Sequence, residues 1–413
     1  MCLDAPAEFL GKPIRFQWNP CETQHHLQLR KRSYFRSAPM EIAFQCLHTE
    51  PSICNKAERA FQKAGKTIAS TFLFKEPVRV NATMMSFCQV TGECGKNMMT
   101  LGGSSPARAI PLLNSDGMTR LHPQALVKQF GLTDHPAFAP FDIIGIFNAD
   151  APFWFEEDNV PIGRNQADFS FVILHELMHG LGFYSGWNEY IGPHMITPDP
   201  SPFLANQLML SINPGTTAIH PSQFLESAMD RLMTDEKRRF LSEHTRELNR
   251  MEAESLEALV VDPRFKAVQS VSEFATEPGT LGIQLSKEEW VVLETGLTPF
   301  QPGSSISHVA YSEYTHTPDF LMRFMQDRGL TLQEAVQRGE GKGPIGPLLL
   351  RIFEEMGYAT VNRPDTVPPL MLFRSGIQKN QRLDKGTLTS SMAIHNSPTL
   401  LYLFFYLLIV LIY

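Results

Sequence analysis

Residues 168–183, DFSFVILHELMHGLGF, combine the signal of a buried helix with a metal-ligand pattern. Apolar side chains occupy most positions around the two histidines, which is typical of a helix enclosed in the interior of a domain. Asp168 is a suitable N-cap, and Gly180 with Gly182 marks the end of the helix. The sequence therefore predicts a domain that is organised around this helix.

His175 and His179 lie four residues apart, so on a helix both side chains point to the same side and can bind one cation. Imidazoles that are buried without a hydrogen-bond partner or a metal are costly. A His-Glu-x-x-His helix typically binds zinc, and Glu176 lies beside the pair as a candidate general base. The alternative is a core helix whose histidines are satisfied by backbone groups.

The helix does not supply the third protein ligand of a catalytic zinc site. In compact metzincins a histidine would follow Gly182 by three residues, but Ser185 occupies that position. A gluzincin would use a downstream glutamate, and Glu189 or one of the glutamates between residues 226 and 257 could serve. No sequence pattern supports any of these glutamates.

A second stretch, GSSISHVAYSEYTHTPDFLM at residues 303–322, resembles leishmanolysin, a metzincin in which a long insertion separates the helix from the third histidine. This resemblance implies that His308 is the third zinc ligand and that Met322 belongs to the turn beneath the metal. His316 is a rival for the ligand. The positions that match the leishmanolysin pattern are His175, Glu176, His179, Gly182, Gly303, Ser304, Ser305, Ser307, His308, Asp319, Leu321 and Met322.

The resemblance also implies a fold and an activity. The expected fold is α+β and zincin-like, with a mixed N-terminal sheet, the active-site helix, a helical insertion and a small, mostly helical C-terminal subdomain. The expected activity is hydrolysis of peptide bonds in a protein or peptide substrate, with Zn²⁺ as cofactor and Glu176 as the catalytic base. A catalytically inactive surface or adhesion protein on this scaffold is one alternative, and a membrane-anchored helical protein with structural histidines is another. The chain departs from leishmanolysin because no cysteine follows Cys94.

The order of segments follows from periodicity and from this layout. Helical spacing predicts helices over 57–72, 331–337 and 347–356, and strand patterns cover 78–87 and 142–149. The glycine- and serine-rich residues 101–108 are expected to form a turn. The expected segments are a cysteine-bearing N-terminal extension without a regular pattern (1–56), a catalytic subdomain (57–183), a largely helical insertion (184–300), a C-terminal subdomain (301–361), a linker (362–398) and an apolar tail (399–413).

In metzincins the strand that precedes the active-site helix forms the upper rim of the cleft and pairs with an extended substrate. By resemblance, residues 142–149 or residues 151–156 would offer backbone groups to a peptide. A strand that is paired on both sides is the alternative for 142–149, and the sequence does not decide between them.

Charge and cysteine content restrict the partners and the compartment. A net charge of -7 gives no basic footprint, so nucleic acid is not an expected partner. All six cysteines lie in the first hundred residues without a C-x-x-C pair, which argues against a cysteine-based zinc site. Their even number suits disulfides in an oxidising compartment, with Cys46–Cys54 and Cys88–Cys94 as the local pairings, and reduced cysteines in the cytosol are the alternative.

Residues 400–413 are apolar and uncharged. This tail is short for a bilayer span of about 20 residues but suits a GPI-attachment signal, with Ser391 as the candidate attachment site and a short tail anchor as the alternative. Asn81, in the N-x-Ser/Thr sequon of the sequence, is a candidate glycosylation site. These features predict a cell-surface or extracellular protein attached to the membrane through the tail or the anchor. Residues 1–20 show no signal peptide, so secretion would require further N-terminal coding sequence.

Overall fold

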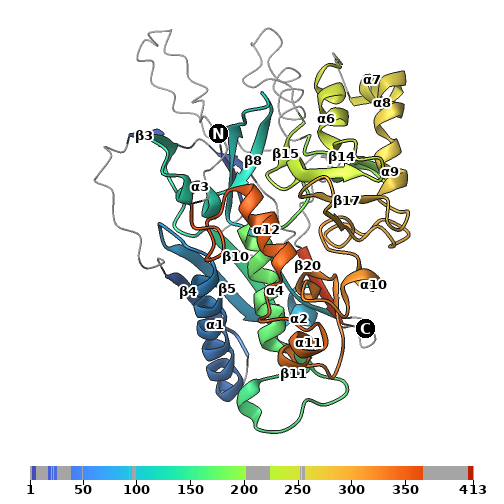
Figure 1. Cartoon of the computed structure of the whole chain (residues 1–413). Helices are drawn as coiled ribbons and strands as arrows, with labels where there is room; N and C mark the ends of the chain where they lie inside the picture. The colour runs from blue at the N-terminus through green and yellow to red at the C-terminus, as the bar shows by residue number, and fades with distance from the viewer. Residues whose placement is uncertain are drawn as a thin grey trace, which may run out of the picture.

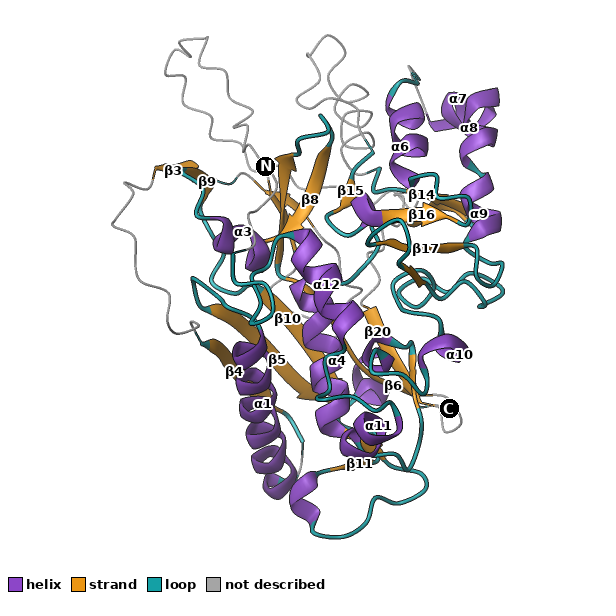
Figure 2. Cartoon of the chain, in the orientation of Figure 1, coloured by secondary structure: helices purple, strands orange, loops and turns teal. Residues whose placement is uncertain are grey.

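The computed structural model describes residues 2–5, 17–19, 21, 23–25, 39–48, 50–92, 94, 99–200, 224–251, 253, 256–365 and 408–412. Across these residues the chain has an α+β fold with mixed sheets, as expected (Figure 2). Its largest sheet has six strands in the order β19-β20-β6-β10-β5-β4. These strands are β4 (Met40–Cys46), β5 (Val78–Met85), β6 (Met99–Pro106), β10 (Ile143–Asn148), β19 (Met325–Gln326) and β20 (Leu408–Ile412).

Two long helices, α1 (Pro51–Thr71) and α4 (Phe169–Leu181), pack against each other and against this sheet (Figure 1). Strands β4, β5 and β10 run parallel, and β6 runs antiparallel to β10. Phe61 of α1 meets Phe147 of β10 and Phe169 of α4, with ring centroids 4.9 and 5.7 Å away. The core therefore joins both helices to the sheet, and α4 lies against β6 and β10.

The expectation of an irregular segment over 1–56 is wrong for its last part. Residues 40–46 form β4, in which alternate side chains are half-buried and the others are exposed. The inward side chain of Phe44 packs on Phe61, with ring centroids 4.8 Å apart. Helix α1 also begins earlier than expected, because Pro51 occupies its first turn, where a missing backbone N–H is tolerated. The alternation over seven residues is short and only half-buried, which explains why it gave a weak signal.

The prediction of a turn over 101–108 is also wrong, because residues 99–106 form the buried strand β6. The small residues of β6 allow α4 to approach it closely. A Cβ atom on Gly102 would lie 3.4 Å from Val172 Cγ1 of α4 and 3.1 Å from the carbonyl oxygen of Ile146. The Ser104 hydroxyl donates a hydrogen bond to the carbonyl oxygen of Glu176. Glycine and serine here serve helix packing and not chain reversal.

The predicted strand at 142–149 is confirmed as β10, and of the two positions that the sequence left open, the strand paired on both sides is the one observed. Strand β10 pairs with β5 on one side and with β6 on the other, and all six of its residues are buried. Its backbone groups are thus used within the sheet. The second proposed rim, residues 151–156, contains β11 (Phe153–Trp154), which pairs with β12 (Ala167–Asp168).

A second sheet has five strands in the order β15-β8-β7-β1-β2. It joins four strands of the N-terminal half to one short strand of the insertion, β15. Its strands are β1 (Cys2–Asp4), β2 (Gln17–Asn19), β7 (Arg108–Leu113), β8 (Thr119–Pro123) and β15 (Glu226–Ser227). The remaining elements of this half are β3 (Thr23–His25), paired with β9 (Asp134–Pro136), together with α2 (Phe87–Thr91), α3 (Gln124–Phe130) and the 3₁₀ helix η1 (Glu156–Asp158).

The expectation of a largely helical insertion over 184–300 is only partly right. Its described residues form strands as well as helices, and these strands have two to five residues, too few for a clear alternation. Besides β15, the strands are β13 (Asn188–Gly192), β14 (Met195–Thr197), β16 (Met233–Asp235), β17 (Leu281–Gln284) and β18 (Trp290–Val292). The helices are η2 (Asp230–Leu232), α6 (Leu241–Asn249), α7 (Leu256–Val261), α8 (Pro263–Val268) and α9 (Ser270–Phe274).

The C-terminal part contains α10 (Tyr311–Tyr314), η3 (Phe320–Met322), α11 (Leu332–Arg338) and α12 (Pro347–Met356). The helices predicted at 331–337 and 347–356 are confirmed. Residues 408–412 of the apolar tail form β20, which pairs with β6 and β19. Within the described residues, no helix has the length and apolar character that a membrane span requires. Ser391 lies outside the described residues.

All six cysteines are paired. The predicted local pairs Cys46–Cys54 and Cys88–Cys94 are confirmed, and the remaining pair is Cys2–Cys21. The Cys46–Cys54 bond joins the end of β4 to the first turn of α1.

The close packing of α4 on the sheet predicts that Gly180→Ala destabilises the fold. An added Cβ atom would lie 2.3 Å from Ile143 Cγ2 of β10. We expect overpacking to cost about 1–3 kcal/mol, more than alanine gains in helix propensity. Thermal unfolding of Gly180→Ala, Ile143→Ala and the double variant measures the coupling, and we expect the double variant to lose less than the sum.

Gly343→Ala is the control, because its added Cβ atom meets no atom within 4 Å. Strict additivity of the Gly180 and Ile143 substitutions would show that the two positions do not pack against each other.

Candidate metal centre

Both ends of α4 are fixed by specific contacts. Asp168 caps the first turn, with Oδ1 accepting from the backbone N–H of Ser170 at 2.8 Å. Its Oδ2 accepts from the N–H of Leu332 at the start of α11, so one carboxylate aligns two helices. At the other end Gly182 has a φ of 120°, and the Tyr358 hydroxyl donates to the carbonyl oxygen of Leu181 at 2.8 Å. The predicted cap and helix end are both confirmed.

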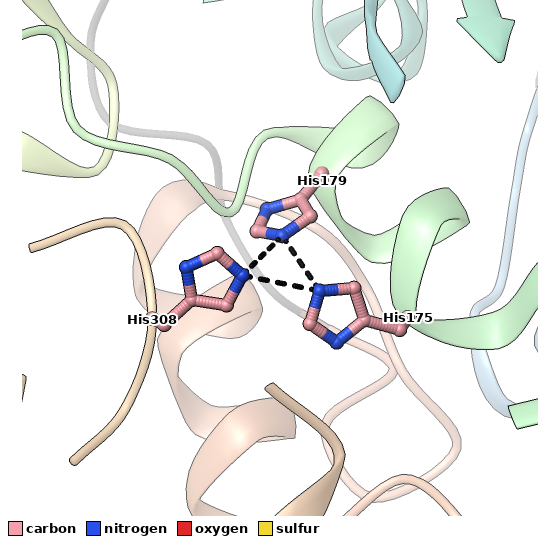
Figure 3. A group of neighbouring side chains, drawn as sticks. All are labelled: His175, His179 and His308. Atoms are coloured by element: carbon pink, nitrogen blue, oxygen red, sulfur yellow. Dashed lines mark hydrogen bonds between the residues drawn. The ribbon is translucent and has the colours of Figure 1, made fainter. Parts of the chain in front are cut away.

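The structure brings His175, His179 and His308 together at one point (Figure 3). Their Nε2 atoms lie 3.0 Å apart for His175 and His179 and 3.1 Å from His308 in both cases. All three side chains are completely buried. The third histidine comes from a loop more than a hundred residues beyond the helix.

Each of the three imidazoles bonds through Nδ1 to a backbone carbonyl oxygen. A carbonyl oxygen can only accept, so Nδ1 carries the proton and the Nε2 lone pair faces the centre of the group. With the proton of each ring on Nδ1, no proton lies between the Nε2 atoms. The three Nε2–Nε2 contacts drawn as dashed lines in Figure 3 therefore bring acceptors together and are not hydrogen bonds. The Nδ1 to oxygen distances are 2.8 Å from His175 to Leu321, 2.6 Å from His179 to Phe183 and 2.8 Å from His308 to Ser304.

This group could hold a metal ion. Three lone pairs that face one another without a shared cation repel, whereas a cation would bind all of them. Zinc with bonds of about 2.0–2.1 Å to tetrahedral ligands separates the nitrogens by roughly 3.3–3.4 Å, close to the spacing seen here. Burial lowers the pKa of all three imidazoles, that of His308 to about 4. The side chains are thus neutral near pH 7, which is the form that binds metals.

Glu176 and Met322 are also buried, with side chains that are completely enclosed. Glu176 lies on α4 between the two histidines in sequence. Met322 ends η3, the turn that supplies the Leu321 carbonyl oxygen to His175. The carbonyl oxygen of Met322 accepts from the N–H of Val309, the residue after His308. The turn therefore supports two of the three histidines.

The acidic residue before this turn has a structural role. Asp319 Oδ1 accepts from the N–H of Leu349 at 2.9 Å in the first turn of α12. A Cβ atom on Gly346 would lie 2.3 Å from the same oxygen, so the helix start and the turn are in close contact. Asp319 thus holds α12 against η3, the turn that supports the histidines.

The alternative ligands lie elsewhere. Glu189 accepts from the N–H of His194. Glu226 forms a buried ion pair with Arg120 at 2.7 Å. His316 is exposed. The candidate glycosylation residue Asn81 is half-buried in β5, between β10 and β4.

A cavity with about 710 Å³ of empty space, part of it open to solvent, is lined by residues of the two loops that follow α4 and carry His308, and not by the three histidines themselves. Its walls include Ser105 of β6, Tyr184 and Trp187 from the loop after α4, and Ser305 and Ser307 from the loop that carries His308. No sequence pattern indicates this cavity or the three carbonyl oxygens that orient the imidazoles, because backbone groups are common to every residue type.

The geometry predicts that His308→Ala removes most of the bound metal, because only two imidazoles would remain. His316→Ala is the matched control, since this exposed histidine lies outside the group. Elemental analysis of the purified proteins gives the metal content per chain. An unchanged content in His308→Ala, or a loss in His316→Ala, would contradict the assignment.

Comparison with known proteins places the chain by sequence. It is 28% identical over 347 residues to a protein of Schizosaccharomyces pombe named uncharacterized protein PB7E8.01. The match covers 76% of this chain and 61% of the relative, so the chain spans less than two thirds of that protein. No solved structure matches the chain. The model of the SPBPB7E8-like family matches residues 26–379, and the chain therefore belongs to this family.

Proposed function

We propose that the chain is a zinc-dependent endopeptidase with a zincin-like arrangement, in which His175, His179 and His308 bind Zn²⁺. The observation that carries this proposal is the convergence of three buried Nε2 lone pairs whose tautomers are fixed by backbone carbonyl oxygens. Three imidazoles leave one position of a tetrahedral zinc open, as a catalytic site requires.

In this proposal Glu176 is the catalytic base. It follows His175 directly on α4 and is enclosed in the same interior. Bound zinc would activate a water molecule and polarise the scissile carbonyl group. Glu176 would accept the proton of the attacking water and later deliver it to the leaving amine. The products are a new carboxyl group and a new amino group.

A peptide substrate is supported by the edge of β6 opposite β10, which pairs with an extended segment. In the structure residues 408–412 of the same chain pair with β6 in the antiparallel direction. Strand β6 also lies against α4 through the hydrogen bond from Ser104 to the Glu176 carbonyl oxygen. Strand addition at this edge is a common mode of peptide recognition, and a substrate would replace residues 408–412 there.

We also propose that the protein is located at the cell surface or outside the cell, attached through its apolar tail or a GPI anchor at Ser391. The three disulfides support an oxidising compartment.

The disulfides predict that none of the six cysteines reacts with an alkylating reagent before reduction. After unfolding and reduction all six should react, which intact-mass spectrometry measures. Alkylation of cysteines in the unreduced, unfolded protein would argue for a reducing compartment.

The proposed base predicts that Glu176→Gln retains metal but loses turnover by about 10²–10⁴-fold, the range that general base catalysis contributes. Cleavage of casein and of a peptide library, together with metal analysis, measures both properties. Glu313→Gln, at an exposed position of α10, is the control and should cleave like the wild type.

Full activity in Glu176→Gln would refute the role of Glu176. A wild-type protein that holds zinc but cleaves no substrate would favour the inactive surface or adhesion protein.

A further inference from the structure

The loop after α4 is held by two side chains of the insertion. Ser227 Oγ donates to the Tyr184 carbonyl oxygen at 2.8 Å. Asp230 accepts from the Ser185 hydroxyl at 2.7 Å through Oδ1 and from the Gly186 N–H at 2.8 Å through Oδ2. Three successive loop residues are therefore bonded to residues 227 and 230.

The same loop contacts one of the three histidines and the residue that precedes another. The Phe183 carbonyl oxygen accepts from His179 Nδ1 at 2.6 Å. The Ser185 N–H donates to Ser307 Oγ at 3.1 Å, and Ser307 directly precedes His308. A displacement of residues 183–186 would thus change the orientation of one ligand and the position of another.

Gly186 of the loop packs so closely on Ser227 and Asp230 of the insertion that no side chain fits between them. A Cβ atom on Gly186 would lie 2.8 Å from the Ser227 nitrogen and 3.0 Å from Asp230 Oδ2. Asp230 is completely buried, and its Oδ2 also accepts from the Ser227 N–H at 2.7 Å. A buried carboxylate needs such donors, and here a hydroxyl and two backbone N–H groups supply them.

The insertion is itself anchored to the N-terminal half. Strand β15, residues 226–227, pairs with β8, and Arg120 of β8 forms an ion pair with Glu226 at 2.7 Å. Neither side chain is exposed. Ser242 also bonds to both partners, at 3.0 Å from Arg120 and 2.8 Å from Glu226, so the buried charges are well compensated. Asp230 therefore acts from a fixed position.

We infer that Asp230 is a positioning residue of the metal centre, which holds residues 183–186 so that His179 and His308 face His175. The inference rests on the proposed metal-dependent function. It assigns the insertion a role as part of the metal site's outer shell. Groups that orient metal ligands typically change metal affinity by about 10–100-fold when they are lost.

The hydrogen bonds that Asp230 accepts distinguish two substitutions, Asp230→Asn and Asp230→Leu. The two donors at Oδ2 are backbone N–H groups, which cannot reverse, whereas the donor at Oδ1 is a hydroxyl, which can turn and accept. An asparagine with its oxygen at the Oδ2 position and its amide toward Ser185 would keep every bond. Leucine has a similar size and keeps none.

The test is metal affinity of the full chain, measured with Zn²⁺ by chelator competition and with Co²⁺ by its visible absorption spectrum. We expect Asp230→Leu to weaken affinity by about 10–100-fold and to change the cobalt spectrum. Asp230→Asn should stay close to the wild type. Ser307→Ala removes only the acceptor of the Ser185 N–H, so we expect a smaller loss of metal affinity. Because both substitutions act through the same loop, their effects on affinity should not add.

Asp235→Leu is the matched control. Asp235 is equally buried in the insertion, with 2% exposure, but bonds to the N–H groups of Lys237 and Arg239 and not to the loop. We expect it to lower the melting temperature without changing the cobalt spectrum.

Wild-type affinity and spectrum in both Asp230→Leu and Ser307→Ala would overturn the inference, as would equal spectral changes in Asp235→Leu. These readouts do not depend on peptide cleavage. A failure of the inference therefore differs from a failure of the peptidase proposal, in which metal binds normally and no substrate is cleaved.

Discussion

Three imidazole nitrogens with their lone pairs directed at one another form the interaction on which the rest of this structure depends. Each lone pair is fixed in place because the opposite ring nitrogen donates to a backbone carbonyl oxygen, which is four residues away for His179 and His308 and in the distant turn at Leu321 for His175. A buried acceptor without a partner costs about 1–3 kcal/mol, so the group favours a cation at its centre. Metal binding would then stabilise the whole fold, because the unfolded chain has no such site.

Small residues and a long insertion serve this arrangement. Gly102 and Ser104 in β6 and Gly180 in α4 allow the helix to lie close to the sheet. At its C-terminal end the helix continues into a loop that contacts both the insertion and the segment of His308. The insertion is thus bonded to the site through buried groups.

Local signals in the sequence were sufficient for α4. The apolar pattern, Asp168 and Gly182 predict its bounds because caps and periodicity act over a few residues. His308 was found through a resemblance and not through spacing, since nothing local connects residues more than a hundred positions apart. Asp230 had no signal, because its partners are backbone groups and a serine hydroxyl that only the fold brings near.

The wrong predictions of a turn over 101–108 and of a largely helical insertion have a common physical origin, because both segments depend on the elements that pack against them. The composition of residues 101–108 is typical of a turn, and only the neighbouring helix explains why glycine and serine are needed inside a strand. The short strands of the insertion depend on their partners in the sheet more than on their own sequence.

X-ray absorption spectroscopy of the purified full chain at the zinc edge tests the metal centre most directly. The proposed function predicts one zinc ion per chain with three imidazole nitrogens at about 2.0–2.1 Å, one oxygen ligand and no sulfur. A site with fewer than three imidazoles, a sulfur ligand, or no bound metal would contradict it.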